Sequence, residues 1–125
     1  MSFQYERDDS RRRVVVAFRG PFQLEEALAC IERHHKEDVW TYGALYDLRL
    51  MTGYPDMSTL RRLLSEDIAG TTGERGPVAI VTTDPDTYRA ACAYSAMAKS
   101  KLRVEAFREI EDADEWLTKN TDAPR

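Results

Sequence analysis

Three aspartates lie where the chain is expected to pass from one element to the next, and they are the residues best placed for chemistry. Asp47 ends an apolar run, Asp56 precedes a run of helical spacing, and Asp84 stands directly before Pro85. Ligands of open parallel sheets usually bind beyond the carboxyl ends of the strands, where such residues meet. Two or three carboxylates there could hold a cation or act as acid and base. Structural roles explain them more simply, because Asp84 can cap a helix and Asp47 can fix the loop after it.

Large apolar side chains also gather in one expected loop, residues 49–57. They are Met51, Tyr54 and Met57, and methionine suits adaptable binding surfaces because its side chain is flexible. The loop could be a lid over a pocket of lipid size, a contact for a protein partner, or a segment folded onto its own core. The sequence leaves these alternatives open.

The histidines and cysteines do not form a recognisable site. His34 and His35 are adjacent, and neighbouring residues on a helix point about 100° apart, so the pair does not chelate one ion comfortably. Cys30 and Cys92 lack Cys-x-x-Cys spacing, which argues against a disulfide framework and a thioredoxin-type site. We therefore expect no metal, no cofactor and no catalytic residues.

Hydrophobic periodicity predicts the elements that position these groups. Strands are expected near residues 3–6, 14–18, 43–48, 78–81 and 102–107, and helices over 23–36, 85–100 and 112–119. A further helix is expected between Ser58, as its N-cap, and Gly70, as its C-cap. Because a strand, a crossover helix and a second strand make a parallel pair, the order β-β-α-β-α-β-α-β-α predicts an α/β sandwich. Its sheet is expected to be mostly parallel, with an antiparallel N-terminal strand.

The chain length and the net charge further restrict the class of protein. A chain of 125 residues buries roughly 65% of its unfolded surface, enough for a single domain over 1–119, with 120–125 as a frayed tail. The net charge of −4 speaks against nucleic-acid binding, and the run Arg11-Arg12-Arg13 is expected to be a solvated hairpin end that facing acids can neutralise. No run approaches the ~20 apolar residues of a membrane span. The N-terminus does not resemble a secretion signal, so a cytoplasmic location is expected.

Three segments resemble the STAS-type fold of the bacterial anti-sigma-factor antagonists and, more narrowly, the STAS-like branch of that family. They are residues 45–48 with the following loop and Ser-bearing helix, 76–81 with the following Asp-Pro helix start, and 107–113 ending in Trp116-Leu117. The likeness spans residues 3–117. It implies an α/β fold of this type and a regulatory role exercised through protein contacts.

The resemblance also implies one candidate switch residue. In that family an Asp-Ser-Ser-Gly motif follows the equivalent strand, and a partner kinase phosphorylates one of its serines at a helix start. Residues 56–59 are equivalent here; Asp56 and Ser58 are present, but the second serine and the glycine are not. Ser58 is thus the candidate switch without an intact motif. A helix N-terminus favours a phosphate on physical grounds too, because its unpaired N–H groups carry partial positive charge.

The sequence favours a non-catalytic regulatory or protein-binding module, because it shows no nucleophile–base pair and no metal cluster. The alternative is a carrier of a small apolar or lipid-like ligand, held between the 51–57 loop and the sheet, since the related lipid-transfer fold (CRAL-TRIO) has similar topology. An enzyme comes third and would need chemistry around Asp47 and Asp84. A homodimer could form through the edge strand at 102–107, although Arg103 and Glu105 can equally prevent such pairing.

Overall fold

The computed structural model describes residues 3–69, 75–99 and 101–121 of the chain. The elements are, in chain order, β1 (Phe3–Asp8), β2 (Arg13–Pro21), α1 (Leu24–Lys36), β3 (Gly43–Thr52), α2 (Met57–Ala69), β4 (Val78–Val81), α3 (Pro85–Ala98), β5 (Val104–Phe107) and α4 (Ile110–Asn120). This confirms the predicted order of strands and helices in a single α/β domain. The predicted C-cap Gly70, the predicted helix end at Ser100 and residues 122–125 of the predicted tail lie outside the described residues, whereas Asn120 belongs to α4.

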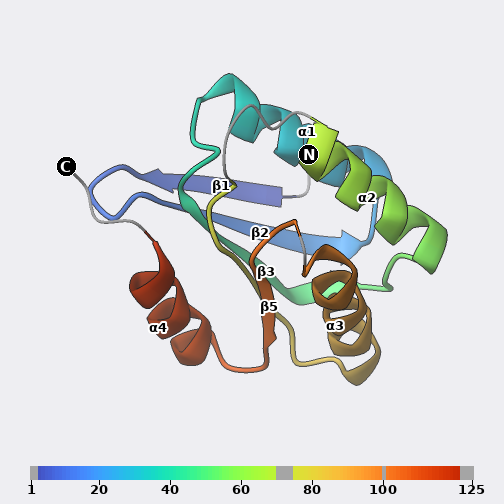
Figure 1. The fold of residues 1–125 in the computed structure, drawn as a ribbon. Helices are drawn as coiled ribbons and strands as arrows, with labels where there is room; N and C mark the ends of the chain where they lie inside the picture. Colours follow the sequence, from blue (N-terminus) through green and yellow to red (C-terminus); the bar gives the residue numbers. More distant parts are fainter. Residues whose placement is uncertain (1–2, 70–74, 100, 122–125) are drawn as a thin grey trace.

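The strands form one mixed sheet in the order β1-β2-β3-β4-β5 (Figure 1). β1 pairs antiparallel with β2, and every later pair is parallel. In the register of the central pair, Leu45 of β3 lies opposite Ala79 of β4. The predicted mostly parallel sheet with an antiparallel N-terminal strand is therefore confirmed.

Helices cover both faces of the sheet, which is why the central strands are apolar on both sides. On one face, Ala44 of β3 belongs to a core cluster with Leu60 of α2 and Ala91 of α3. On the other face, Leu45 packs with Leu117 of α4. α1, α2 and α3 thus share one layer and α4 lies on the opposite side (Figure 1). No described helix is both long enough and apolar enough to cross a membrane.

β3 is longer than its sequence suggested, because its neighbour β2 continues to Pro21 and offers it hydrogen-bonding partners. β3 runs past the predicted end at residue 48, so the first part of the expected 49–57 loop is strand. The register shifts between Ala17, opposite Asp47, and Arg19, opposite Leu50. β3 therefore carries an extra residue there, as in a β-bulge. Successive side chains of a strand point to opposite faces, so Met51 is buried whereas its neighbour Leu50 is exposed.

An acid on α4 faces two arginines of the run at the β1–β2 hairpin. Arg11 donates to the carboxylate of Asp114 on α4 across 2.7 Å. Arg13 donates to the same carboxylate and also to the Thr118 hydroxyl across 3.2 Å. Arg13 is buried against α4, so the expectation of a solvated hairpin end is wrong for this residue.

Candidate functional site, a cavity with one polar end

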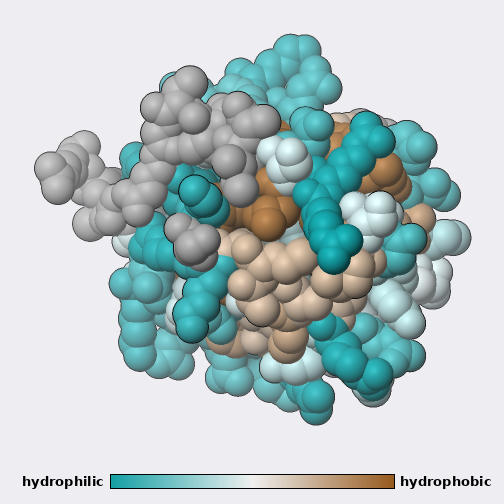
Figure 2. Space-filling model, turned by 45° about the vertical axis from the view of Figure 1, so that its right-hand side comes forward, coloured by the Kyte–Doolittle hydropathy of each residue, from teal (hydrophilic) through white to brown (hydrophobic). Residues whose placement is uncertain are grey.

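A cavity of about 130 Å³ lies between the sheet and helices α1, α2 and α3. Its wall is mostly apolar and includes Ile31 of α1, Leu63 of α2 and Ile80 of β4. Protein interiors are close-packed, so a hollow of this volume beside the core is a departure from ordinary packing. Figure 2 brings the right-hand side of Figure 1 forward and shows apolar surface framed by hydrophilic side chains. An apolar cavity with a few convergent polar groups is the default candidate for a binding site.

The polar groups of the wall converge at Asp67, which α2 directs into the layer between the helices and the sheet. Tyr94 of α3 donates a hydrogen bond to the Asp67 carboxylate. Arg75 lies beside them: its Nη2 is 4.0 Å from Asp67 Oδ1 and donates to the Tyr46 hydroxyl across 3.1 Å. Asp67, Arg75 and Tyr94 are buried. The cavity therefore has an apolar body and one charged, hydrogen-bonded end.

Arg75 reaches this interior position because the next residue is a glycine. A Cβ on Gly76 would lie 2.2 Å from the carbonyl oxygen of Tyr42, so that only glycine permits this close approach of two backbone segments. The Gly76 amide donates to the Trp40 carbonyl across 3.0 Å, and the Arg75 guanidinium lies over the Trp40 ring, 4.2 Å from its centroid. Nε and Nη1 of Arg75 make no hydrogen bond within the described ranges. Stacking on the indole thus replaces part of its hydration.

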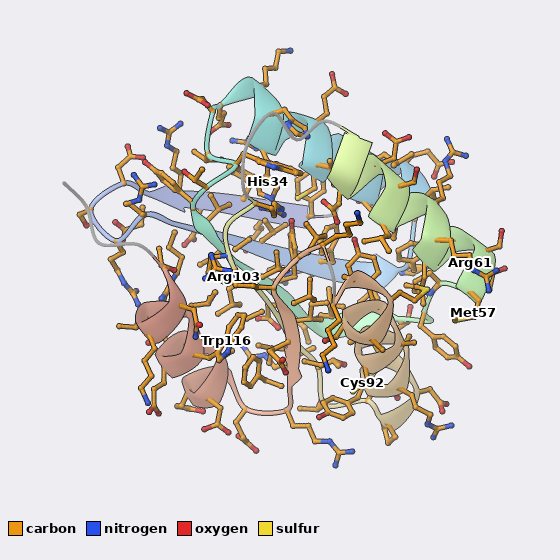
Figure 3. All side chains as sticks on the ribbon, in the orientation of Figure 1. His34, Met57, Arg61, Cys92, Arg103 and Trp116 are labelled. Carbon is orange, nitrogen blue, oxygen red and sulfur yellow. The ribbon has the colours of Figure 1, made fainter. Side chains whose placement is uncertain are left out.

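A relay of hydrogen bonds continues from Arg75 to the edge of the sheet. His34 Nε2 lies 2.8 Å from the Tyr46 hydroxyl, and His34 Nδ1 lies 3.2 Å from the Tyr5 hydroxyl. Arginine only donates, so the Tyr46 oxygen accepts from Arg75 and its single proton is available to Nε2. With that proton donated to Nε2, Nδ1 is the protonated nitrogen and donates to Tyr5. In Figure 3, His34 points from α1 toward the sheet.

Burial fixes the protonation states around the cavity. It lowers the pKa of His34 to about 3, with the nearby charge of Arg75 acting in the same direction. Burial raises the pKa of Cys30 to about 12 and raises that of Tyr46 and Tyr94. At neutral pH the imidazole is therefore uncharged, and the thiol and phenols keep their protons. Such groups can recognise a ligand, but they are not activated nucleophiles or bases.

Asp47 and Asp84, two of the three aspartates singled out in the sequence, accept hydrogen bonds from nearby residues. Asp47 accepts from Arg49 Nε across 2.9 Å and from Nη2 across 2.8 Å. Asp84 caps α3, as predicted, by accepting from the backbone and the hydroxyl of Thr87 across 2.9 Å and 3.0 Å. Within residues 3–69, 75–99 and 101–121, no group of three or more His, Cys, Asp or Glu side chains could hold a metal ion.

The predicted N-cap of α2 is wrong by two residues. The helix begins at Met57, and its cap is Asp56, whose carboxylate accepts from the Thr59 amide across 2.8 Å and whose carbonyl accepts from Leu60. Aspartate caps as well as serine does, and its charge also suits the positive end of the helix dipole. Ser58 therefore lies within the first turn of α2, with its side chain exposed.

The expected apolar loop splits into an inner and an outer set of side chains. Met51 and Pro55 line the cavity. Tyr54 and Met57 do not: 52% and 44% of their surfaces are exposed, and Leu50 is exposed by 61%. We call the outer set, Leu50, Tyr54 and Met57, the β3–α2 patch. Figure 3 shows Met57 and Arg61 together at one end of α2, projecting from the body of the molecule.

Asp67, Arg75 and Tyr94 were not predicted from the sequence to be members of a site. A signal was present for Asp67, which follows Leu63 by four residues and Leu64 by three and so continues the apolar stripe of α2. A charge on such a stripe predicts a buried acid that needs a partner. No comparable local signal marks Arg75.

Comparisons with known proteins agree with this architecture. No family model matches the sequence, and no curated protein matches it. Among solved structures, the chain is similar to the anti-sigma factor antagonist SpoIIAA in its unphosphorylated form, with a TM-score of 0.51 and 16% sequence identity. The match covers 91% of this chain and 96% of that chain. This likeness shows the fold and confirms the STAS-type architecture expected from the sequence.

Proposed function

We propose that this protein is a regulatory, protein-binding module of the cytoplasm, and that the β3–α2 patch is its contact surface. The observation that carries the proposal is the exposure of Leu50, Tyr54 and Met57, which are the exposed large apolar side chains among the described residues. Scattered exposed apolar residues need no explanation, but a group within one segment indicates a contact site. The STAS-type fold, shared with an anti-sigma factor antagonist, supports the same role.

The surroundings of the patch suit a partner that is apolar and acidic. Arg61 and Arg62 are exposed on α2, and Arg61 follows Met57 by one helical turn. Arginine binds carboxylates through paired donors and is enriched at protein interfaces. We therefore expect the partner to place apolar side chains on the patch and carboxylates opposite these two arginines.

Ser58 is the proposed switch of this contact. It is exposed, adjoins Met57, and lies in the first turn of α2, where added negative charge is favoured by the helix dipole. A phosphate would bring about −1.5 to −2 charges to a surface proposed to meet an acidic partner. Phosphorylation should then release the partner while leaving the fold intact.

The test compares two sets of three exposed substitutions. One variant combines Leu50→Ser, Tyr54→Ser and Met57→Ser; its control places serine at exposed Glu111, Asp112 and Glu115 on α4. A photocrosslinker at position 54 identifies the partner in cells, and calorimetry with the purified partner measures its affinity. We expect the patch variant to lose binding and the control to retain it. Equal binding by both variants would show that the contact lies elsewhere.

A second function, carriage of a small apolar ligand, is favoured by the cavity. Ala90 lines it, so Ala90→Leu should reduce its volume, whereas Ala96→Leu on the exposed side of α3 should not. Organic extracts of the three purified proteins, analysed by mass spectrometry, should contain one compound missing only from Ala90→Leu. Extracts that do not differ would contradict this function.

A further inference from the structure

We infer that two copies of this chain pair antiparallel through β5, in the register that places Arg103 of each copy opposite Glu105 of the other. β5 is the last strand of the sheet, so within the described ranges no strand lies on its outer side. An exposed edge presents unpaired N–H and C=O groups with which another chain can pair. The inference is independent of the functions proposed above, because it involves neither the β3–α2 patch nor the cavity.

The hydrogen bonds between β4 and β5 show which backbone groups of β5 face outward. The Val78 amide donates to the Arg103 carbonyl across 2.8 Å, so the backbone groups of residue 103 face β4. These groups alternate in direction along a strand, and those of Val104 and Ala106 therefore point away from the sheet. The Val104 carbonyl already accepts from the Ser95 hydroxyl, but a carbonyl has two lone pairs and can accept again. Val104 and Ala106 thus offer donors and acceptors to a further strand.

The space beside this edge is open. A groove of about 520 Å³ runs along β5 between α3 and α4. Its wall on α3 includes the small side chains Cys92, Ser95 and Ala96, and its wall on α4 includes Trp116 and Asn120. Figure 3 shows Cys92 and Trp116 on either side of β5. Small side chains next to the edge leave room for a second strand and for the helix that accompanies it.

The charges on β5 identify the occupant as a second copy of the chain. Arg103 and Glu105 are exposed and lie two residues apart, so they share one face of the strand. The Arg103 guanidinium donates to the Asn120 carbonyl across 3.0 Å and keeps further donors for a carboxylate. Charges of one sign would make the edge repel its own copy. Charges of opposite sign at this spacing instead complement a reversed copy of the same strand.

The same charges decide the register of the pairing. With Val104 opposite Ala106 of the second copy, the two Glu105 side chains would lie directly opposite each other, which is destabilising. With Ala106 opposite itself, Glu105 would face Phe107 and gain no partner. With Val104 opposite itself, the two Val104 residues exchange both hydrogen bonds, and Arg103 lies opposite Glu105 on each side, with Cα atoms about 4.5 Å apart. A two-fold axis at Val104 thus produces two equal ion pairs in a closed dimer.

Sedimentation equilibrium of the purified protein over a concentration series tests the dimer, and exchange of the two charges tests its register. We expect a reversible dimer whose dissociation constant rises about tenfold in Arg103→Glu and in Glu105→Arg, because each change turns both ion pairs into like-charge pairs. Combining the two substitutions restores opposite charges and should return the constant to within about twofold of its original value. The control Arg19→Glu, on exposed β2 surface separated from β5 by two strands, should leave it unaltered.

A proline tests the backbone pairing independently of charge. In this register the Ala106 amide donates to the Leu102 carbonyl of the second copy, so Ala106→Pro should weaken the dimer; proline is tolerated on an edge strand where the missing N–H faces outward. Circular dichroism checks that each variant is folded, and if Ala106→Pro is not, the charge exchange decides. A chain that stays monomeric at every concentration would overturn the dimer. A dimer indifferent to the single charge changes, or not restored by the double exchange, would overturn pairing through β5.

Discussion

Acidification from pH 7 to pH 5 is expected to lower the free energy of unfolding by about 2 kcal/mol through a single side chain, His34. Burial lowers the pKa of this imidazole from its usual 6.5 to about 3. An unfolded chain takes up the proton near pH 6.5, whereas the folded chain resists it until about pH 3. The stability that His34 contributes is complete above pH 6.5 and is lost as the pH falls toward 3. At ~1.4 kcal/mol per pH unit, the ~1.5 units between 6.5 and 5 give this magnitude.

The surroundings of His34 explain why the folded protein resists the proton. Protonation would make both ring nitrogens donors, so Tyr5 and Tyr46 would both have to accept from the ring, although Tyr46 already accepts from Arg75. It would also add a positive charge near Arg75, which already lowers the pKa of the imidazole. The groups that face the ring are Tyr5 from β1, Tyr46 from β3, Cys30, Arg33 and His35 from α1, and Arg75.

The assay is urea unfolding of the unaltered protein, His34→Gln and His35→Gln at both pH values. His34→Gln removes the titrating group, so its loss of stability between pH 7 and 5 should be smaller by about 2 kcal/mol, while His35→Gln should retain the effect. Burial raises the pKa of Asp67, which acts in the opposite direction but is common to all three proteins. Nitrogen NMR should find His34 neutral with its proton on Nδ1. An imidazole that titrates near pH 6.5, or equal pH dependence with and without His34, would refute the reasoning.

Three substitutions test the remaining contacts. Ser58→Asp should weaken binding of the proposed partner in calorimetry and change stability by less than about 0.5 kcal/mol; unaltered affinity would dismiss the switch. Asp114→Asn removes the charged partner of buried Arg13 and should cost about 1–3 kcal/mol in urea unfolding; a cost near zero would mean that α4 does not depend on this pair. Gly76→Ala should cost more than about 2 kcal/mol, because its Cβ would meet backbone at 2.2 Å; a stable variant would exclude so close an approach.

The elements that could be predicted are those whose signals lie within their own short stretch of sequence. β4 is a continuous apolar run, and its observed bounds, Val78–Val81, coincide with the prediction because a strand covered on both faces needs no polar positions. Asp84 and Pro85 carry the start of α3 within two neighbouring residues, through a side-chain cap and a fixed backbone angle. Each signal depends on the segment's own side chains, so that it can be recognised without knowledge of the tertiary structure.

The parts that were not predictable depend on distant partners. β3 continues past Leu48 because β2 lies beside it, and the residue types at 49–52 do not indicate that this stretch pairs with β2. The adjacency of His34 and His35 argues against chelation, but it does not say which ring is buried against Tyr46. Arg75 lies in a stretch of loop composition, and its burial follows from Gly76 meeting the backbone of residues 41–42. The polar end of the cavity is thus a product of tertiary packing.

The β3–α2 segment joins the two proposed sites, because its alternate residues face opposite ways. Met51 and Pro55 line the cavity, whereas Leu50 and Tyr54 are exposed in the β3–α2 patch. A ligand that favours one arrangement of this segment must change partner affinity by the factor by which the partner changes ligand affinity. We expect the compound extracted from the cavity to shift the affinity of the purified partner, and Ala90→Leu to abolish that shift without altering basal binding. A partner affinity that does not change at saturating concentrations of that compound would show that the two faces of the segment are not coupled.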